Sequence, residues 1–234
     1  MNTLPVYNLP LFWTVLFLAL IPLPVFLLAR LAYRGGNARA ATIVVVVYVL
    51  YFAYVLTGTQ RGWFAANTFP ARIVLFGTVP FAFFLFGVVW PSGWFQRLRE
   101  RLDAADFIAV HLFRVVGGFF LVLTALQTLP AWFGLIAGIG DVTTALTSIF
   151  VARAVRARRP RAKRLALAWN TFGLVDILFT AIAANVLTKL ALDSGDAGVA
   201  VLAQFPFALI PAFAPPTILF LHLVIYQKLK KIDG

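Results

Sequence analysis

The sequence contains no cysteine and only two histidines, and just 12% of its 234 residues are charged. Without cysteine there are no disulfides and no thiol chemistry, so the sequence does not indicate an oxidising or a reducing compartment. Soluble domains are typically about 25% charged, so the shortage of charge excludes that class. HExxH pairs, GxGxxG loops and Walker-type loops are also missing, which removes the usual signatures of metal- and nucleotide-dependent enzymes. An enzyme is therefore the less favoured class.

What is present is apolar residues. They make up 62% of the chain, and the mean hydropathy is +0.93. These values predict a multi-pass integral membrane protein. The net charge of +12 does not indicate a nucleic-acid partner, because the basic residues occupy short gaps between apolar runs.

The pattern predicts an all-α fold, a single seven-helix transmembrane domain over residues 1–234. Each apolar run is bounded by charge or by Pro and Gly, and a run of about 20 residues crosses a bilayer as a helix. A single helix over 107–152 would be too long for a bilayer, so the turn at Thr128 to Pro130 separates two spans. The expected spans are 11–33, 41–57, 71–90, 107–127, 131–152, 165–187 and 205–226.

The distribution of Lys and Arg predicts the orientation. Apart from Arg114, only Arg61, Arg72 and Lys189 fall in the second, fourth and sixth gaps, and every other basic residue falls in the alternate gaps or at the C-terminus. The positive-inside rule then places the N-terminus outside and the C-terminus in the cytoplasm. No basic residue precedes the first apolar run, so we expect that run to be a retained helix rather than a signal peptide.

The segment from Asp106 to Gln127 carries His111 and Arg114 one helical turn apart, followed by Gly117 and Gly118. An ionisable residue inside a membrane helix is costly and by default indicates a functional site. Arg114 therefore needs partners from other helices.

Position along each helix, at roughly 1.5 Å per residue, predicts those partners. Asp141 and Asp176 fall at one depth near the middle of the membrane. The two histidines share a shallower level with Asn170, and Thr144 lies on the polar stripe of Asp141. Arg114 neutralises only one aspartate, so we expect a proton on the second or a charged histidine.

The last span contains Pro206, Pro211, Pro215 and Pro216. Each interior proline frees the carbonyl four residues earlier, and freed carbonyls line cavities in transporters. Tyr48, Tyr51 and Tyr54 of the second span do not share a face, so we expect most of them to contact lipid or the interface.

Four functions are compatible with this polar set. The first is a small-solute or proton-linked carrier or channel that uses Arg114, Asp141, Asp176, Asn170 and Thr144. The second is a b-type haem protein with His111 and His222 as axial ligands. The third is a metal enzyme that uses the two histidines and one aspartate. In the fourth, a non-catalytic structural or partner subunit, the polar groups only join helices, at roughly 0.6 kcal/mol per hydrogen bond.

The basic run over 153–164 is expected to be a cytoplasmic anchor loop, and anionic lipid is the partner that such a run favours. The sequence does not specify the oligomeric state.

Four elements together carry a family resemblance. They are HLFRVVGGFFL, the pair Gly140 and Asp141, the pair Trp169 and Asn170, and the ending FPFALIPAFAPPTILFLHL. The set resembles a family of small bacterial integral membrane proteins without an assigned activity, over the fourth to seventh spans only. The resemblance implies a location in the bacterial inner membrane and a polar core, but no reaction.

Overall fold

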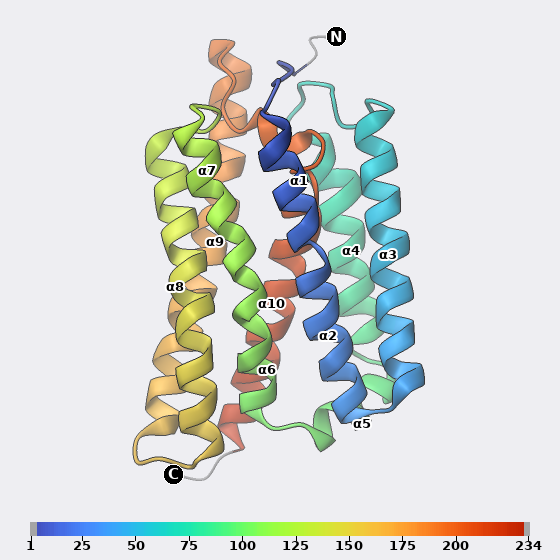
Figure 1. The fold of residues 1–234 in the computed structure, drawn as a ribbon, viewed down its shortest axis with the longest axis vertical. Helices are drawn as coiled ribbons and strands as arrows, with labels where there is room; N and C mark the ends of the chain where they lie inside the picture. The colour runs from blue at the N-terminus through green and yellow to red at the C-terminus, as the bar shows by residue number, and fades with distance from the viewer. Residues whose placement is uncertain (1–3, 232–234) are drawn as a thin grey trace.

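The computed structural model describes residues 4–231, and the predicted all-helical class is confirmed, with no strand in that part of the chain. The helices form a bundle in which the described start and end of the chain lie at opposite ends (Figure 1). The elements are α1 (Leu11–Leu20), α2 (Pro22–Gly35), α3 (Ala38–Gln60), η1 (Val74–Thr78), α4 (Val79–Phe83), η2 (Phe84–Val89), α5 (Gly93–Arg101), α6 (Ala104–Val110), η3 (His111–Gly118), α7 (Phe119–Ala125), α8 (Ala131–Arg156), α9 (Ala162–Ser194), η4 (Ala200–Ala203) and α10 (Leu209–Lys230).

Six helices in this part of the chain are long and apolar enough to cross a membrane, and a bent pair makes up to seven. Large apolar side chains such as Phe26, Phe83, Phe150 and Ile182 point outward and are more than half exposed. Such a surface is rare on soluble monomers and is the normal lipid-facing surface of a membrane protein. The chain is therefore an integral membrane protein.

Several expected spans differ in detail from the helices observed. The first is broken at Ile21, where Pro22 begins α2. The last begins at Leu209 rather than at residue 205, and a short 3₁₀ turn, η4, precedes it. The sixth continues to Ser194, which makes α9 33 residues long, or roughly 50 Å. Its end projects past the neighbouring helices in Figure 1.

The third pass is largely π-helical, in two segments, η1 and η2, separated by α4. The chain then turns by 79° into α5, which runs across the end of the bundle. Ser92 caps α5 by accepting a hydrogen bond from the backbone N–H of Phe95 at 3.2 Å. Asp103 and Asp106 form a capping box at the start of α6, which fixes where the fourth pass begins.

The fourth pass changes its winding in the middle. Between α6 and α7 the chain forms η3, an eight-residue 3₁₀ segment from His111 to Gly118. Long 3₁₀ runs are uncommon, and within a helix they often mark a functional hinge. This segment carries Arg114 into the interior, where it faces α8, α9 and α10.

Candidate functional site

Arg114 is held at the centre of η3, and its side chain is fully buried. Side chains three residues apart eclipse one another in a 3₁₀ helix, so His111, Arg114 and Gly117 share one face. That face is directed at three other helices, which supply the partners of the guanidinium: α8 with Asp141, α9 with Gly173 and Asp176, and α10 with His222.

Four of the five N–H groups of Arg114 have partners. Nε donates to Oδ1 of Asp141 at 2.6 Å. Nη1 donates to the backbone oxygen of Gly173 at 3.0 Å and lies 3.2 Å from Nε2 of His222. Nη2 donates to Oδ2 of Asp176. The side chains of Asp141 and Asp176 are 9% and 7% exposed, so the ion pairs are largely shielded from solvent.

Two glycines make this close approach possible. A Cβ on Gly117 would lie 2.1 Å from Oδ2 of Asp141, and a Cβ on Gly140 would lie 1.8 Å from Oδ1 of Asp176. No other residue fits at either position without displacing a carboxylate. In the sequence Gly117 and Gly140 stand near charged residues, but no sequence pattern marks them as the surfaces against which the carboxylates rest.

The tautomer of His222 follows from its two neighbours. Arg114 has only donors, so Nε2 of His222 accepts and Nδ1 carries the proton. Nδ1 lies 2.8 Å from Oδ1 of Asn170, which accepts that proton, and Nδ2 of Asn170 donates to the backbone oxygen of His222 at 3.1 Å. His222 is therefore neutral in this arrangement. We call Arg114, Asp141, Asp176, Asn170 and His222 the Arg114 cluster.

His111 and Thr144 lie beside the Arg114 cluster but do not bond to it. Both are fully buried, and neither ring nitrogen of His111 nor the hydroxyl of Thr144 has a hydrogen-bond partner within residues 4–231. The ring of His111 contacts His222, with 4.3 Å between centroids, and meets Trp169 edge-on at 5.3 Å. The Thr144 hydroxyl thus makes no hydrogen bond to the Arg114 cluster in this arrangement, and its functional role stays a prediction.

The histidine pair does not have the geometry of a haem site. Two axial ligands lie on opposite faces of a porphyrin, which would have to pass between the imidazoles, whereas these rings touch at a tilt of 37°. Both nitrogens of His222 are also engaged by Arg114 and Asn170. The assignment of His111 and His222 as haem b ligands thus stays a prediction that this side-chain arrangement does not favour. Among the described residues no three His, Asp or Glu side chains are placed to hold a metal ion.

The predicted separation between a histidine level and an aspartate level also changes. His222 and both aspartates contact the same guanidinium, because the long Arg114 side chain bridges the two levels. Depth estimated from backbone position does not include this reach.

The carbonyls freed by the prolines of α10 have partners. Pro215 and Pro216 cannot donate to the oxygens of Pro211 and Ala212, four residues earlier. Thr78 of η1 donates to the oxygen of Pro211 at 2.7 Å, and Tyr51 of α3 donates to the oxygen of Ala212 at 3.1 Å. The prediction that these oxygens line an open cavity is replaced by a hydrogen-bonded joint between three passes.

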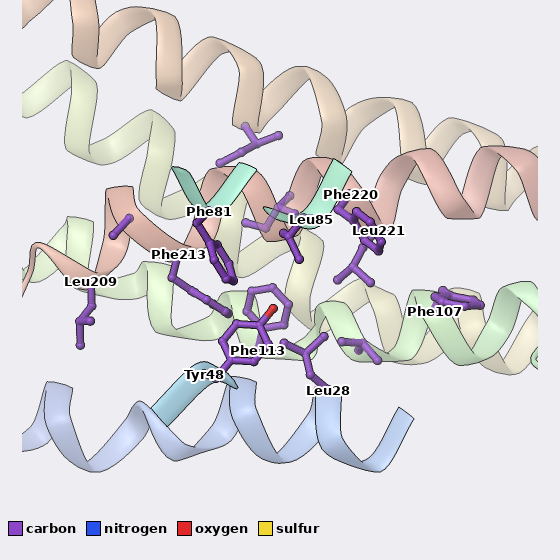
Figure 2. Close-up of a cluster of buried hydrophobic side chains, with 14 of the residues drawn as sticks. Leu28, Tyr48, Phe81, Leu85, Phe107, Phe113, Leu209, Phe213, Phe220 and Leu221 are labelled. Atoms are coloured by element: carbon purple, nitrogen blue, oxygen red, sulfur yellow. The ribbon is translucent and has the colours of Figure 1, made fainter. Parts of the chain in front are cut away.

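The tyrosines of α3 correct a second expectation. Tyr48 is buried and its hydroxyl lies 3.4 Å from that of Thr217, while Tyr51 stacks on Phe81 at 4.2 Å between centroids. Tyr54 donates to the backbone oxygen of Phe76 at 2.9 Å. All three tyrosines face neighbouring helices rather than serving only as lipid contacts. Figure 2 shows Tyr48 beside Phe81, Phe113 and Phe213 in the apolar core.

A small cavity of about 40 Å³ adjoins the cluster at Arg114 and Asp141. Its other walls are apolar and include Ile21 and Pro24 at the break between α1 and α2, and Ala214 next to the prolines of α10. One water needs about 10 to 15 Å³, so the cavity has room for roughly three. It lies directly against the Arg114–Asp141 ion pair and is too small for an organic solute.

At the basic end of the bundle, Asp106 binds Arg34 of α2 at 2.5 Å and Arg156 of α8 at 3.0 Å. Arg156 thus has a protein partner, whereas Arg153, Arg158 and Arg159 of the predicted 153–164 lipid patch are exposed.

A family model described as a domain of unknown function (DUF8737) matches residues 69–230. The match begins ahead of the third pass, so it extends beyond the fourth to seventh spans that carry the resemblance seen in the sequence. Comparison with curated proteins gave no match. Comparison with solved structures gave none either.

Proposed function

Since the chain belongs to the DUF8737 family, a family of unknown function, we propose from the geometry of the site that it is a proton-linked carrier or channel. The observation that carries the proposal is the charge of the Arg114 cluster. One arginine faces two aspartates, His222 is a neutral acceptor, and His111 makes no hydrogen bond to the cluster. The cluster therefore has one negative charge in excess unless a proton occupies a carboxylate, and unpaired charge in a low-dielectric interior is strongly disfavoured.

The state of Arg114 supports a cation rather than an anion as the species that binds. Four of its five N–H groups are already used within the cluster. An anionic solute would have to displace an aspartate to reach it. A proton, by contrast, binds a carboxylate directly and removes the excess charge.

The small cavity beside Arg114 would give a proton a water-filled route to Asp141. Waters in it would contact Asp141 and Arg114 and lie against the break between α1 and α2, beside the prolines of α10. Breaks in membrane helices occur where transporters form their sites. Proton exchange between Asp141 and the cavity waters needs no larger opening, and Asp176 tunes it through the shared charge of Arg114.

Liposomes that contain the purified protein and enclose a pH-sensitive dye test the proposal. An imposed pH gradient should dissipate in the wild type, and Asp141→Asn and Asp176→Asn should each reduce the rate at least tenfold. Asp193→Asn is the matched control, because Asp193 lies on α9 like Asp176 but is exposed and pairs with Lys189. Unchanged flux in both cluster variants would remove the idea.

The second candidate, a structural or partner subunit, is favoured by the closed hydrogen bonding of the proline-containing helix. It predicts no flux in the wild type, together with a lower melting temperature in the cluster variants.

The location and orientation of the protein are a separate part of the proposal. The sequence resemblance supports the proposal of a bacterial plasma membrane. The basic loops gather at the end where α5 and the end of α10 lie (Figure 1), which supports the proposal of an outside N-terminus. Reporter fusions to residue 231 and to the loop over 61–71 test this orientation. The exposed arginines of the loop over 157–161 then face anionic lipid.

A further inference from the structure

A second cavity, of about 110 Å³, lies away from the Arg114 cluster near the basic end of the bundle. Five passes and the helix α5 line it, with residues that include Leu28 of α2, Val47 of α3, Leu85 of η2, Phe107 of α6, Leu221 of α10 and Leu98 of α5. Figure 2 shows Leu28, Leu85 and Leu221 on these facing helices. An apolar cavity of roughly 150 Å³ stays free of water and binds benzene, so this one suits a length of hydrocarbon.

The lining leaves little for a polar ligand to bond. The polar side-chain groups present are the indole N–H of Trp94 and the hydroxyls of Tyr48 and Thr217, and the two hydroxyls face each other at 3.4 Å. The cavity also reaches the lipid-facing surface, since its lining residue Ile43 is 48% exposed. A hydrocarbon chain from the bilayer can therefore enter between α3 and the third pass.

The helix α5 closes this cavity at the end of the bundle. It is turned by 79° from the third pass, and Trp94, Phe95 and Leu98 on its inner face contact the space. A short helix with apolar residues inward and basic residues outward, lying across the end of a bundle, has the character of an interfacial helix.

Two arginines of α5 lie next to the cavity wall. Arg97 and Arg101 follow Trp94 by three and seven residues, so they stand along the side of the helix that Trp94 occupies. Both are exposed, and neither has an ion-pair partner in the part of the chain that is described. Arg99, on the other flank, is already engaged by Gln227 and Trp90.

We propose that the cavity holds part of one acyl chain of an anionic phospholipid whose phosphate is bound by Arg97 and Arg101. The apolar lining accounts for the chain, and the two unpaired guanidiniums at its end account for the negative headgroup. This site is separate from the exposed arginines of the loop over 157–161 and does not depend on proton transfer by the Arg114 cluster.

Native mass spectrometry of the delipidated protein tests the proposal, with phosphatidylglycerol and phosphatidylcholine of the same chain length as probes. One phosphatidylglycerol should bind in preference to phosphatidylcholine. Arg97→Gln and Arg101→Gln should each weaken phosphatidylglycerol binding about fivefold, the factor expected for one basic residue at the membrane surface. Val47→Phe, which fills the cavity, should abolish binding of both lipids at this site.

Two controls separate this site from others. Val49→Phe adds the same bulk on an exposed position of α3 and should bind lipid as the wild type does. Arg158→Gln removes a loop arginine and should leave the preference intact. If the preference survives in the Arg97→Gln/Arg101→Gln double variant, or is lost in Arg158→Gln instead, the headgroup assignment is wrong. If folded Val47→Phe protein binds as the wild type does, the chain does not occupy the cavity.

Discussion

Nη1 of Arg114 and Nε2 of His222 lie 3.2 Å apart in the interior of the bundle. Because the guanidinium only donates, this contact holds His222 as a neutral acceptor and leaves its Nδ1 proton for Asn170. The histidine thus orients the arginine without adding positive charge. The excess negative charge therefore stays with the two aspartates that Arg114 also binds.

Removal of Arg114 should destabilise the protein strongly. Arg114→Gln leaves Asp141 and Asp176 buried without a counter-charge, and breaking a buried ion pair from one side costs about 3 to 5 kcal/mol. Thermal unfolding in detergent measures the loss. The triple variant Arg114→Gln/Asp141→Asn/Asp176→Asn should recover much of it, since no charge is then left buried. A triple variant no more stable than Arg114→Gln would contradict the charge argument.

The two adjacent glycines of η3 should respond differently to a methyl group. Gly117→Ala places its Cβ against the Asp141 carboxylate, whereas Gly118→Ala meets Val142 at an ordinary 3.5 Å. Overpacking typically costs about 1 to 3 kcal/mol, so Gly117→Ala should lower the melting temperature and the proton flux. Gly118→Ala is the matched control and should change both little. Equal effects in the two variants would mean that contact with Asp141 is not what distinguishes them.

Tyr51 and Pro216 should be energetically coupled. Tyr51→Phe leaves the Ala212 oxygen without its donor, which should cost about 1 to 3 kcal/mol. Pro216→Ala restores a backbone N–H four residues after Ala212, so the same Tyr51→Phe change should cost less in that background. Chemical unfolding of the four members of this cycle measures the coupling. As a control, Tyr33→Phe at an exposed position of α2 should not change the stability. If the costs of Tyr51→Phe and Pro216→Ala simply add, the hydrogen bond from Tyr51 does not replace the one that Pro216 removes.

Replacement of His111 and of His222 should have opposite effects on stability. His111→Phe replaces two buried, unpaired nitrogens by carbon in a ring that keeps its contact with Trp169. An unsatisfied buried polar group costs about 1 to 3 kcal/mol, so the variant should be as stable as the wild type or more so. His222→Phe, which loses its bonds to Arg114 and Asn170, should be less stable. A large loss of stability in His111→Phe would show that its nitrogens have partners in the membrane.

Much of the fold follows from the sequence because hydrophobic length alone sets the membrane-spanning elements. Distances from charged boundaries also placed Asp141 and Asp176 at one height, and the structure brings both to Arg114. These features depend on helix rise, which varies little.

What the sequence did not predict depends on winding and side-chain reach. The 3₁₀ segment η3 and the π-helical third pass change which residues share a face, and no apolar pattern distinguishes them from an α-helix. The roles of Tyr51 and Thr78 were missed because their acceptors lie on α10, more than 130 residues away in the chain. A signal was available, since two interior prolines imply two carbonyls that need donors.

The central claim is that the Arg114 cluster holds an exchangeable proton on an aspartate. Infrared difference spectroscopy of the purified protein during a pH change observes this directly, through the C=O stretch of a protonated carboxyl group. The account predicts such a band in the wild type and in Asp193→Asn, and its loss or shift in Asp141→Asn or Asp176→Asn. A wild-type spectrum with no pH-dependent carboxyl band, or a band unaffected by both cluster variants, would contradict it.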